Sequence, residues 1–200
     1  MGARAWAMAM VPVFIKADGA VVVVVGAGPV GTRKALEWAS AGAVVRVVAP
    51  AATVELRAAA DGNALTYSAK EFEPSDLDGA FFVVAATNVP AVNAAVAVAA
   101  NERHLFVNAI DDLPNATAYA ASTIRRGPFT IALASGGEAP ALTRLMREVL
   151  ESVLPPDAWI ARARELRRGW KHRGTPMDAR FPELLDEFSQ RAKVDRDPST

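Results

Sequence analysis

The stretch AVVVVVGAGPVGTRKALEWASAG, from Ala20 to Gly42, joins a run of β-branched residues, a glycine-rich turn and a helical pattern. A continuous apolar run of this kind is typical of a strand buried on both faces of a parallel sheet. Gly42 is placed to end the helix that follows. The order of strand, glycine turn and helix therefore predicts the first unit of an α/β fold.

The same alternation continues along the first half of the chain. Strands are expected at 43–50, closed by Pro50, at 65–72, at 79–87 and at 104–110, with helices at 51–60 and 90–101 between them. Val11–Ile15 is expected to add an edge strand. Repeated strand–helix units predict a doubly wound, Rossmann-type parallel sheet with right-handed crossovers.

The pattern changes near Pro114. Residues 115–122 are small and polar, RRGP forms a turn, and residues 128–135 form a strand. A strongly amphipathic helix follows, which Pro155–Pro156 ends. Its apolar stripe comprises Leu142, Leu145, Met146, Val149, Leu150, Val153 and Leu154. Two more helices, at 158–174 and 177–193, and a disordered tail from 194 complete the prediction.

Composition excludes several kinds of protein. The 200 residues carry no net charge, so nothing points to nucleic acid, and no cysteine is available for a disulfide or a thiolate metal site. Two histidines argue against a protein-built transition-metal site, so none is predicted. No apolar window is long enough to span a membrane. We read residues 1–16 as a ragged leader rather than a signal peptide, and expect a cytoplasmic protein.

The glycine turn has the spacing G-x-G-x-x-G at Gly26, Gly28 and Gly31. Its place after a buried strand and before a helix is the context that a dinucleotide site requires. Gly26 permits the tight turn, Gly28 lets the backbone approach a pyrophosphate, and Gly31 allows close packing of helix on sheet. Pro29 and Val30 are predicted to lie over the cofactor. A glycine turn without a ligand is the less favoured alternative.

The acid that grips the ribose in many such folds is missing, because the second strand ends in VVAP at Val47–Pro50. Pro50 and Ala51 are expected to flank the adenosine. Arg33 and Lys34 either reach a phosphate or belong to a solvated helix face. We favour NAD over NADP as the cofactor.

Substrate residues are expected where parallel strands end. Thr87 and Asp111 stand at two such ends. Thr87 is expected to contact the cofactor, and Asp111 is the best-placed group for taking a proton. Asp112 is interpreted as an ordinary turn residue. His104 begins its strand at the opposite edge and is expected to be structural.

A second glycine turn, Ser135-Gly136-Gly137, precedes the amphipathic helix. Ser135 is either a helix cap or an anion donor. Arg126 and Arg144, with Arg125 and Arg147, either receive an acidic substrate or are solvated. The basic run at 162–173 is usually a solvated helix face. Trp159 and Trp170 are expected to pack.

Taken together, four segments resemble the precorrin-2 dehydrogenase/sirohydrochlorin ferrochelatase family, the dehydrogenase part of siroheme synthase. They are the stretch from Pro12 to Pro50, VVAATNVPAVN, FVNAIDD, and RRGPFTIALASGGEAPALTRLMREVLESVLP. The Asn-x-x-Asp strand end followed by Ser-Gly-Gly-x-x-Pro is not a general Rossmann feature.

The resemblance implies an NAD-dependent oxidoreductase that converts precorrin-2, an octacarboxylate tetrapyrrole, to sirohydrochlorin. Some members also insert ferrous iron into sirohydrochlorin, a lyase reaction. The sequence leaves open whether this protein catalyses that step and whether the metal is iron or cobalt. It also leaves open whether the product is used to make siroheme or cobalamin. It implies a homodimer, with a Rossmann domain at 1–113, a dimerisation and substrate segment at 114–146, and a helical domain at 147–200. No methyltransferase module is expected.

Carried over by residue, the resemblance implies a catalytic role for Asp111 and cofactor contacts at Gly28–Gly31 and Pro50–Ala51. The substrate residues that we expect are Asn108, Ser135, Gly136, Arg126 and Arg144. The motif serine is modified in some relatives, and Ala134 stands where some carry a second hydroxyl. A dinucleotide-sensing Rossmann module without catalysis is the alternative function.

Overall fold

The computed structural model describes residues 10–154 and 157–194, with side chains up to 189. Residues 1–9 of the expected leader, the pair Pro155–Pro156 expected to end a helix, and the tail beyond 194 lie outside the described residues. Contacts divide the chain into two compact units. The first comprises the described residues up to Ala121 together with Ala134–Ala139, and the second comprises Ser122–Leu133 and the described residues from Pro140 onward. The domain limits expected at 113 and 146 stay a prediction.

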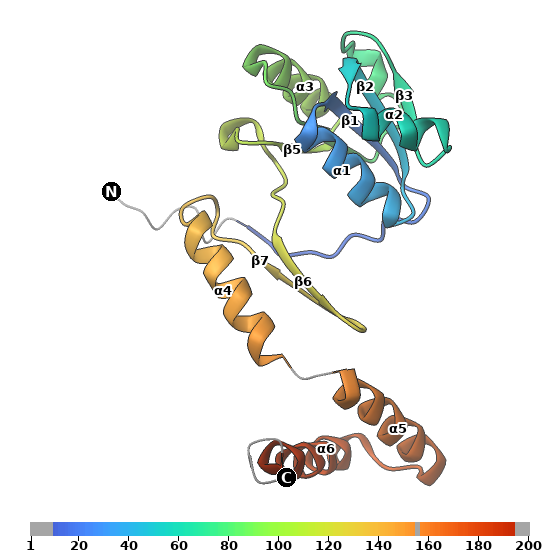
Figure 1. Ribbon diagram of the computed structural model, residues 1–200, viewed down its shortest axis with the longest axis vertical. Helices are drawn as coiled ribbons and strands as arrows, with labels where there is room; N and C mark the ends of the chain where they lie inside the picture. Colours follow the sequence, from blue (N-terminus) through green and yellow to red (C-terminus); the bar gives the residue numbers. More distant parts are fainter. Residues whose placement is uncertain (1–9, 155–156, 195–200) are drawn as a thin grey trace. The chain divides into compact units, whose positions relative to one another are not determined.

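The first unit is a five-stranded parallel sheet in the order β3-β2-β1-β4-β5 (Figure 1). Its strands are β1 (Val21–Ala27), β2 (Val44–Ala52), β3 (Thr66–Ser68), β4 (Phe82–Ala85) and β5 (Phe106–Ala109). The helices between them are α1 (Pro29–Ser40), α2 (Val54–Asp61) and α3 (Pro90–Glu102). The doubly wound sheet predicted from the sequence is confirmed. The strand order reverses between β1 and β4, which is where such sheets bind ligands.

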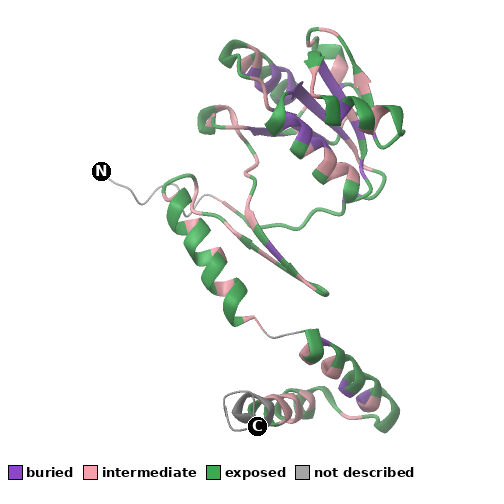
Figure 2. Ribbon diagram, in the orientation of Figure 1, coloured by how far each residue is buried: buried purple, intermediate pink, exposed green. Residues whose placement is uncertain are grey.

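The valine-rich strands are buried on both faces (Figure 2). Val22 and Val24 of β1 belong to a cluster with Ala35 of α1 and Leu56 of α2. Alternate residues such as Val23 point the other way, into a cluster that includes the apolar face of α3. Each valine buried in this way contributes roughly 1.5–3 kcal/mol. The continuous apolar runs in the sequence therefore have two layers of helix to bury them.

The end of β2 differs from the prediction. The strand continues past Pro50 to Ala52, because pairing with β1 resumes at Ala27↔Ala52 after an irregularity. Proline has no N–H to donate, yet it is tolerated here beside the irregular part of the ladder. The next helix starts at Val54, and not at Ala51 as expected, because the Thr53 side chain accepts a hydrogen bond from its first turn.

The edge strand predicted at Val11–Ile15 is wrong. These residues pair with no strand, and Val11 and Phe14 are exposed. An apolar segment forms a strand only where a partner completes the ladder, and Pro12 lacks the N–H that an internal position would need.

The second unit begins with an antiparallel hairpin of β6 (Ser122–Arg126) and β7 (Phe129–Leu133). The sequence predicted β7 but placed Arg125 and Arg126 in a turn, which is wrong, since both lie in β6. Only Gly127 and Pro128 form the turn. Helices α4 (Pro140–Val153), α5 (Asp157–Arg173) and α6 (Met177–Val194) follow, close to the three helices expected.

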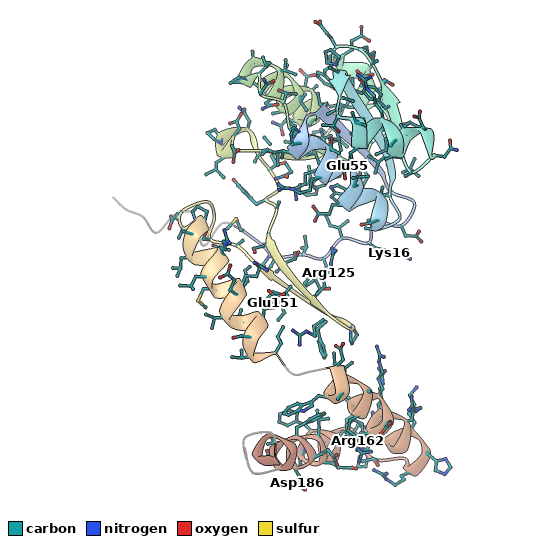
Figure 3. The ribbon with its side chains drawn as sticks, viewed as in Figure 1. Lys16, Glu55, Arg125, Glu151, Arg162 and Asp186 are labelled. Carbon is teal, nitrogen blue, oxygen red and sulfur yellow. The ribbon has the colours of Figure 1, made fainter. Side chains whose placement is uncertain are left out.

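Helices α5 and α6 pack through aromatic and charged contacts. The Trp159 and Phe188 rings lie 4.6 Å apart, and buried Trp170 donates a hydrogen bond to Glu183, so the packing role predicted for both tryptophans is confirmed. Arg162 lies between the two helices (Figure 3) and donates to both carboxylate oxygens of Glu187 at 2.9 and 3.2 Å. Those bonds, with a further one to Glu165, raise the pKa of the Arg162 guanidinium above its ordinary value.

Within the described part of the chain, no helix is long and apolar enough to cross a membrane. The described residues also hold no group of three or more His, Cys, Asp or Glu side chains that would bind a metal ion. The cytoplasmic location stays a prediction.

Candidate dinucleotide and substrate site

The carboxyl ends of four neighbouring strands form one edge of the first unit. Backbone hydrogen bonds continue past the strands, from Thr53 N to Ala27 O at 3.1 Å and from Ala86 N to Val25 O at 2.8 Å. Ile110 N likewise donates to Ala85 O at 2.9 Å. The loops after β1, β2, β4 and β5 therefore start side by side. The predicted residues at or just beyond these strand ends are Gly26, Gly28, Pro29, Val30, Gly31, Pro50, Ala51, Thr87 and Asp111.

Two of the three motif glycines are required by packing inside the protein. Gly26 has φ +107°, and a Cβ placed on it would lie 2.5 Å from Ala86 O. A Cβ on Gly31 would overlap the carbonyl of Gly26. Both positions therefore exclude any side chain. The roles predicted for Gly26 in the turn and Gly31 in helix–sheet packing agree with these contacts.

The start of α1 is open to an anion. Gly28 precedes the helix without a side-chain cap, and the first turn contains no acid. The first amide N–H groups of a helix have no partner within it, and the helix dipole favours negative charge there. A Cβ on Gly28 would meet no atom within 4 Å, and Gly28, Pro29 and Val30 are exposed. These features fit the pyrophosphate of a dinucleotide.

A pair of hydroxyl groups ties this loop to the end of β2. Thr32, which is 1% exposed in α1, has its Oγ1 2.8 Å from Thr53 Oγ1. Thr53 Oγ1 in turn accepts from Leu56 N and so caps α2. The glycine loop and the Pro50–Ala51 segment are therefore joined by one hydrogen-bonded link.

We expect Thr32→Val to lower the free energy of unfolding by about 1–2 kcal/mol, because the isosteric side chain removes the buried hydroxyl that pairs with Thr53 Oγ1 and donates to Ala27 O at 3.4 Å. Urea denaturation measures the change. Thr66→Val, which removes the bond from Thr66 Oγ1 to Val45 O at the β3 edge, is the matched control for a lost threonine hydroxyl. NAD affinity should fall in Thr32→Val and stay constant in Thr66→Val; equal affinities would argue against the link.

Asp111 stands just past β5 in a left-handed backbone conformation, with φ +56°. Aspartate adopts this region more readily than most residues, but at some cost in energy. The side chain is exposed and has no hydrogen-bond or ion-pair partner among the described residues. Asp112 instead accepts a hydrogen bond from Asn115 Nδ2 at 2.8 Å. This local bond agrees with the interpretation of Asp112 as a turn residue, and the catalytic role of Asp111 stays a prediction.

Asn108 lies on β5 and is 8% exposed. Its Nδ2 donates to Ala118 O at 3.0 Å, and Val107 N beside it donates to Thr117 Oγ1 at 2.9 Å. Asn108 thus holds the loop that follows Asp111. A contact of Asn108 with substrate stays a prediction.

The second glycine turn lies against the Asp111 loop. A Cβ on Gly137 would come within 2.7 Å of Leu113 Cδ1, so this turn packs on the residue two positions after Asp111. Ser135 Oγ accepts from Ala139 N at 3.2 Å, just ahead of α4. This hydrogen bond supports the alternative in which Ser135 caps the helix. Tertiary structure brings Ser135 and Gly136 close to the Asp111 loop.

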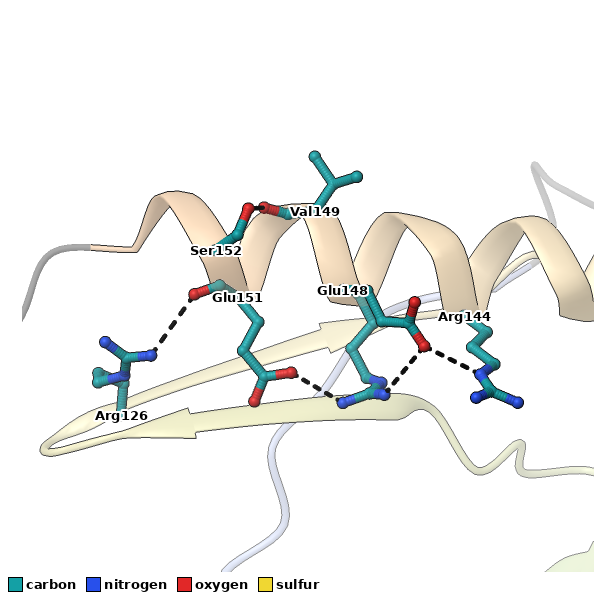
Figure 4. Close-up of polar contacts among 7 residues, drawn as sticks. Arg126, Arg144, Glu148, Val149, Glu151 and Ser152 are labelled. Carbon is teal, nitrogen blue, oxygen red and sulfur yellow. Dashed lines mark hydrogen bonds and ion pairs between the residues drawn. The ribbon is translucent and has the colours of Figure 1, made fainter.

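Arg126 and Arg144 belong to the second unit, where both have partners (Figure 4). Arg144 Nε donates to Glu148 Oε1 at 3.0 Å, and its side chain is 79% exposed. Arg126 Nη2 lies 3.5 Å from the carbonyl oxygen of Glu151. Substrate binding by these two residues stays a prediction.

Asn93 is a residue of this edge that the sequence did not single out. It lies in α3, is 5% exposed, and its side chain bonds to Thr87. One signal was present: an asparagine within an otherwise Ala/Val-rich helix, where a buried amide needs a partner.

Comparison with known proteins decides the family. A family model described as putative NAD(P)-binding matches residues 13–122. The chain belongs to this family. The match covers the glycine loop, all five parallel strands and the Asp111 loop, which is the part of the molecule that carries the edge described above.

Individual relatives extend the likeness. Siroheme synthase 1 of Pectobacterium atrosepticum is 42% identical over 166 residues, which is 83% of this chain and 34% of that protein. Siroheme synthase 1 of Aeromonas salmonicida is 43% identical over 148 residues, covering 74% and 32%. The chain thus spans about a third of the length of these relatives.

Among solved structures, the precorrin-2 dehydrogenase SirC superposes with a TM-score of 0.76 at 26% identity, over 88% of both chains. Together with the siroheme synthases, this confirms the resemblance to the precorrin-2 dehydrogenase/sirohydrochlorin ferrochelatase family predicted from the sequence.

Proposed function

We propose that the protein is an NAD-dependent precorrin-2 dehydrogenase that forms sirohydrochlorin. One observation carries the proposal: the unpartnered, exposed carboxylate of Asp111 lies on the same sheet edge as the uncapped glycine loop. The solved precorrin-2 dehydrogenase and the siroheme synthases of similar sequence support it. A catalytic base and a dinucleotide site on one edge are what ring oxidation requires.

The reaction removes one hydride and one proton from the ring. NAD, when bound, accepts the hydride. The protein then has to orient the ring and receive a proton, and Asp111 is proposed to receive it on a carboxylate oxygen. Gly28 and the first turn of α1 would hold the pyrophosphate, and Pro50 and Ala51 would flank the adenosine.

NAD is proposed over NADP. Residues 47–52 contain no lysine or arginine that would pair with a 2′-phosphate at the end of β2. Comparison of the two cofactors at equal concentration tests this choice directly, and a higher kcat/KM with NADP would contradict it.

The test of the function is anaerobic incubation of the purified protein with precorrin-2 and NAD, followed by visible absorption. Conversion that requires NAD supports the dehydrogenase. Binding of NAD without conversion contradicts it and favours the dinucleotide-sensing module. A parallel incubation of sirohydrochlorin with ferrous iron or cobalt, without NAD, tests chelatase activity, for which the ring nitrogens would be the metal ligands.

A homodimer is also proposed, through α4. Five apolar side chains of this helix are exposed in the described chain, namely Leu142, Leu145, Met146, Val149 and Val153. They follow helical spacing, and α4 also contacts β6. An apolar stripe of this size is typical of a protein–protein interface. A second copy of the chain is the occupant that the family resemblance implies.

Leu145→Glu should convert the dimer to a monomer, because it buries an unpaired charge in the proposed interface. Sedimentation velocity measures the change. Arg144→Glu places a glutamate at a position that is 79% exposed and lies off the apolar stripe of the same helix, so it should leave the dimer intact. A Leu145→Glu protein that sediments like the wild type would rule out this interface.

A further inference from the structure

The loop between β4 and α3 is held by one buried side chain. Asn93 is one of three polar residues buried in the described chain, with Thr32 and Asn108. It belongs to the second turn of α3, on the face that packs against the sheet. A buried amide is costly unless its donors and acceptor are satisfied. Its partners therefore show what the residue is for.

In the described structure, the Asn93 side chain makes three hydrogen bonds, all of them to Thr87. Asn93 Oδ1 accepts from Thr87 N at 3.1 Å, and Nδ2 donates to Thr87 O at 3.0 Å. Oδ1 also lies 2.7 Å from Thr87 Oγ1. The amide pairs with both backbone groups of Thr87, as a neighbouring strand would. It thereby fixes the chain two residues after β4 ends.

The Thr87 loop is also the surface on which the glycine loop packs. A Cβ on Gly26 would lie 2.7 Å from Ala86 C and 2.9 Å from Thr87 N, so the two backbones are in direct contact. This contact is between β1 and β4, where the strand order reverses. Movement of the Ala86–Thr87 peptide would therefore displace one wall of the crevice in which a dinucleotide binds.

We infer that Asn93 is a positioning residue for dinucleotide binding: it holds the Thr87 backbone against Gly26 and so fixes the crevice between β1 and β4. The inference rests on the proposed use of NAD. Asn93 itself is covered by protein and acts only through Thr87 and Gly26. Rigid support of this kind is what keeps binding groups in their productive geometry.

Asn93→Asp is the sharpest variant, because it keeps the size of the side chain and the acceptor for Thr87 N. It replaces the Nδ2 donor with an oxygen that faces Thr87 O. We expect the Kd for NAD, measured by titration of the full-length protein, to rise about tenfold. KM for NAD should rise by a similar factor, while kcat at saturating NAD changes less than twofold. A general loss of folded protein would lower the active fraction instead.

Thr66→Val serves as the control for stability, since it removes a side-chain hydrogen bond at the β3 edge, away from the crevice. The Kd of Thr66→Val for NAD should equal that of the wild type even if the substitution lowers the melting temperature. If Asn93→Asp does not fold, Asn93→Ser decides, because the shorter side chain cannot span both backbone groups of Thr87.

Two failures can be told apart. A wild-type protein that binds no NAD would remove the proposed cofactor, and with it the basis of the inference. A wild-type protein that binds NAD, with Asn93→Asp or Asn93→Ser folded and binding equally well, would overturn the role of Asn93 alone.

Discussion

Asp111→Asn should lower kcat for precorrin-2 oxidation at least about 100-fold, because the amide cannot take a proton from the ring. The variant should fold like the wild type, since the Asp111 side chain has no partner among the described residues to lose. Asparagine also tolerates the φ of +56° at this position. NAD affinity should stay constant, because the change affects proton transfer alone.

The neighbouring acid provides the matched control. Asp112→Asn makes the same chemical change one residue away, where the carboxylate only accepts a bond from Asn115. We expect it to retain activity within about twofold, with at most a loss of about 1 kcal/mol in stability. Anaerobic turnover with both variants distinguishes the two acids. Equal activity of Asp111→Asn and the wild type would remove Asp111 from the mechanism.

The second large effect is on stability, and it should differ between Gly26 and Gly28 of the glycine motif. Gly26→Ala should destabilise the protein by at least about 3 kcal/mol, because a Cβ at φ +107° is strained and would lie 2.5 Å from Ala86 O. Gly28→Ala should change stability by less than about 0.5 kcal/mol, since its φ of −71° suits alanine and its Cβ would meet nothing.

Gly28→Ala should weaken NAD binding although it leaves the stability of the protein unchanged. A methyl group there would occupy the space that the pyrophosphate is proposed to use, so the Kd for NAD should rise about tenfold or more in a protein that is fully folded. Thermal denaturation and NAD titration of both variants test the pair. Unchanged affinity in Gly28→Ala would contradict the placement of the pyrophosphate.

Much of the fold could be predicted because its signals are local. The valine runs of β1 and β4, the glycine turn and the helix after it each lie within a short window. Strand β6 was missed because Ser122–Arg126 is polar apart from Ile124 and gains its structure from pairing with β7. Val11–Ile15 was overpredicted for the complementary reason, since an apolar run without a pairing partner is not a strand.

The candidate site likewise contains residues that the sequence identified and one that it did not. Its motif glycines and Asp111 were identified from spacing, from strand ends and from the family resemblance. Asn93 was not, because its role depends on Thr87, which lies six residues earlier on the other side of a turn.

The sequence by itself determined the alternation of strands and helices from β1 to β5, the glycine loop and the acid at the end of β5, because each depends on neighbouring residues. Only the tertiary structure decided that Gly26 packs on Ala86 while Gly28 faces open space. It also decided that the Ser135–Gly137 turn lies on the Asp111 loop. These contacts join residues far apart in the chain, so they depend on how the sheet orders its strands and not on any short pattern.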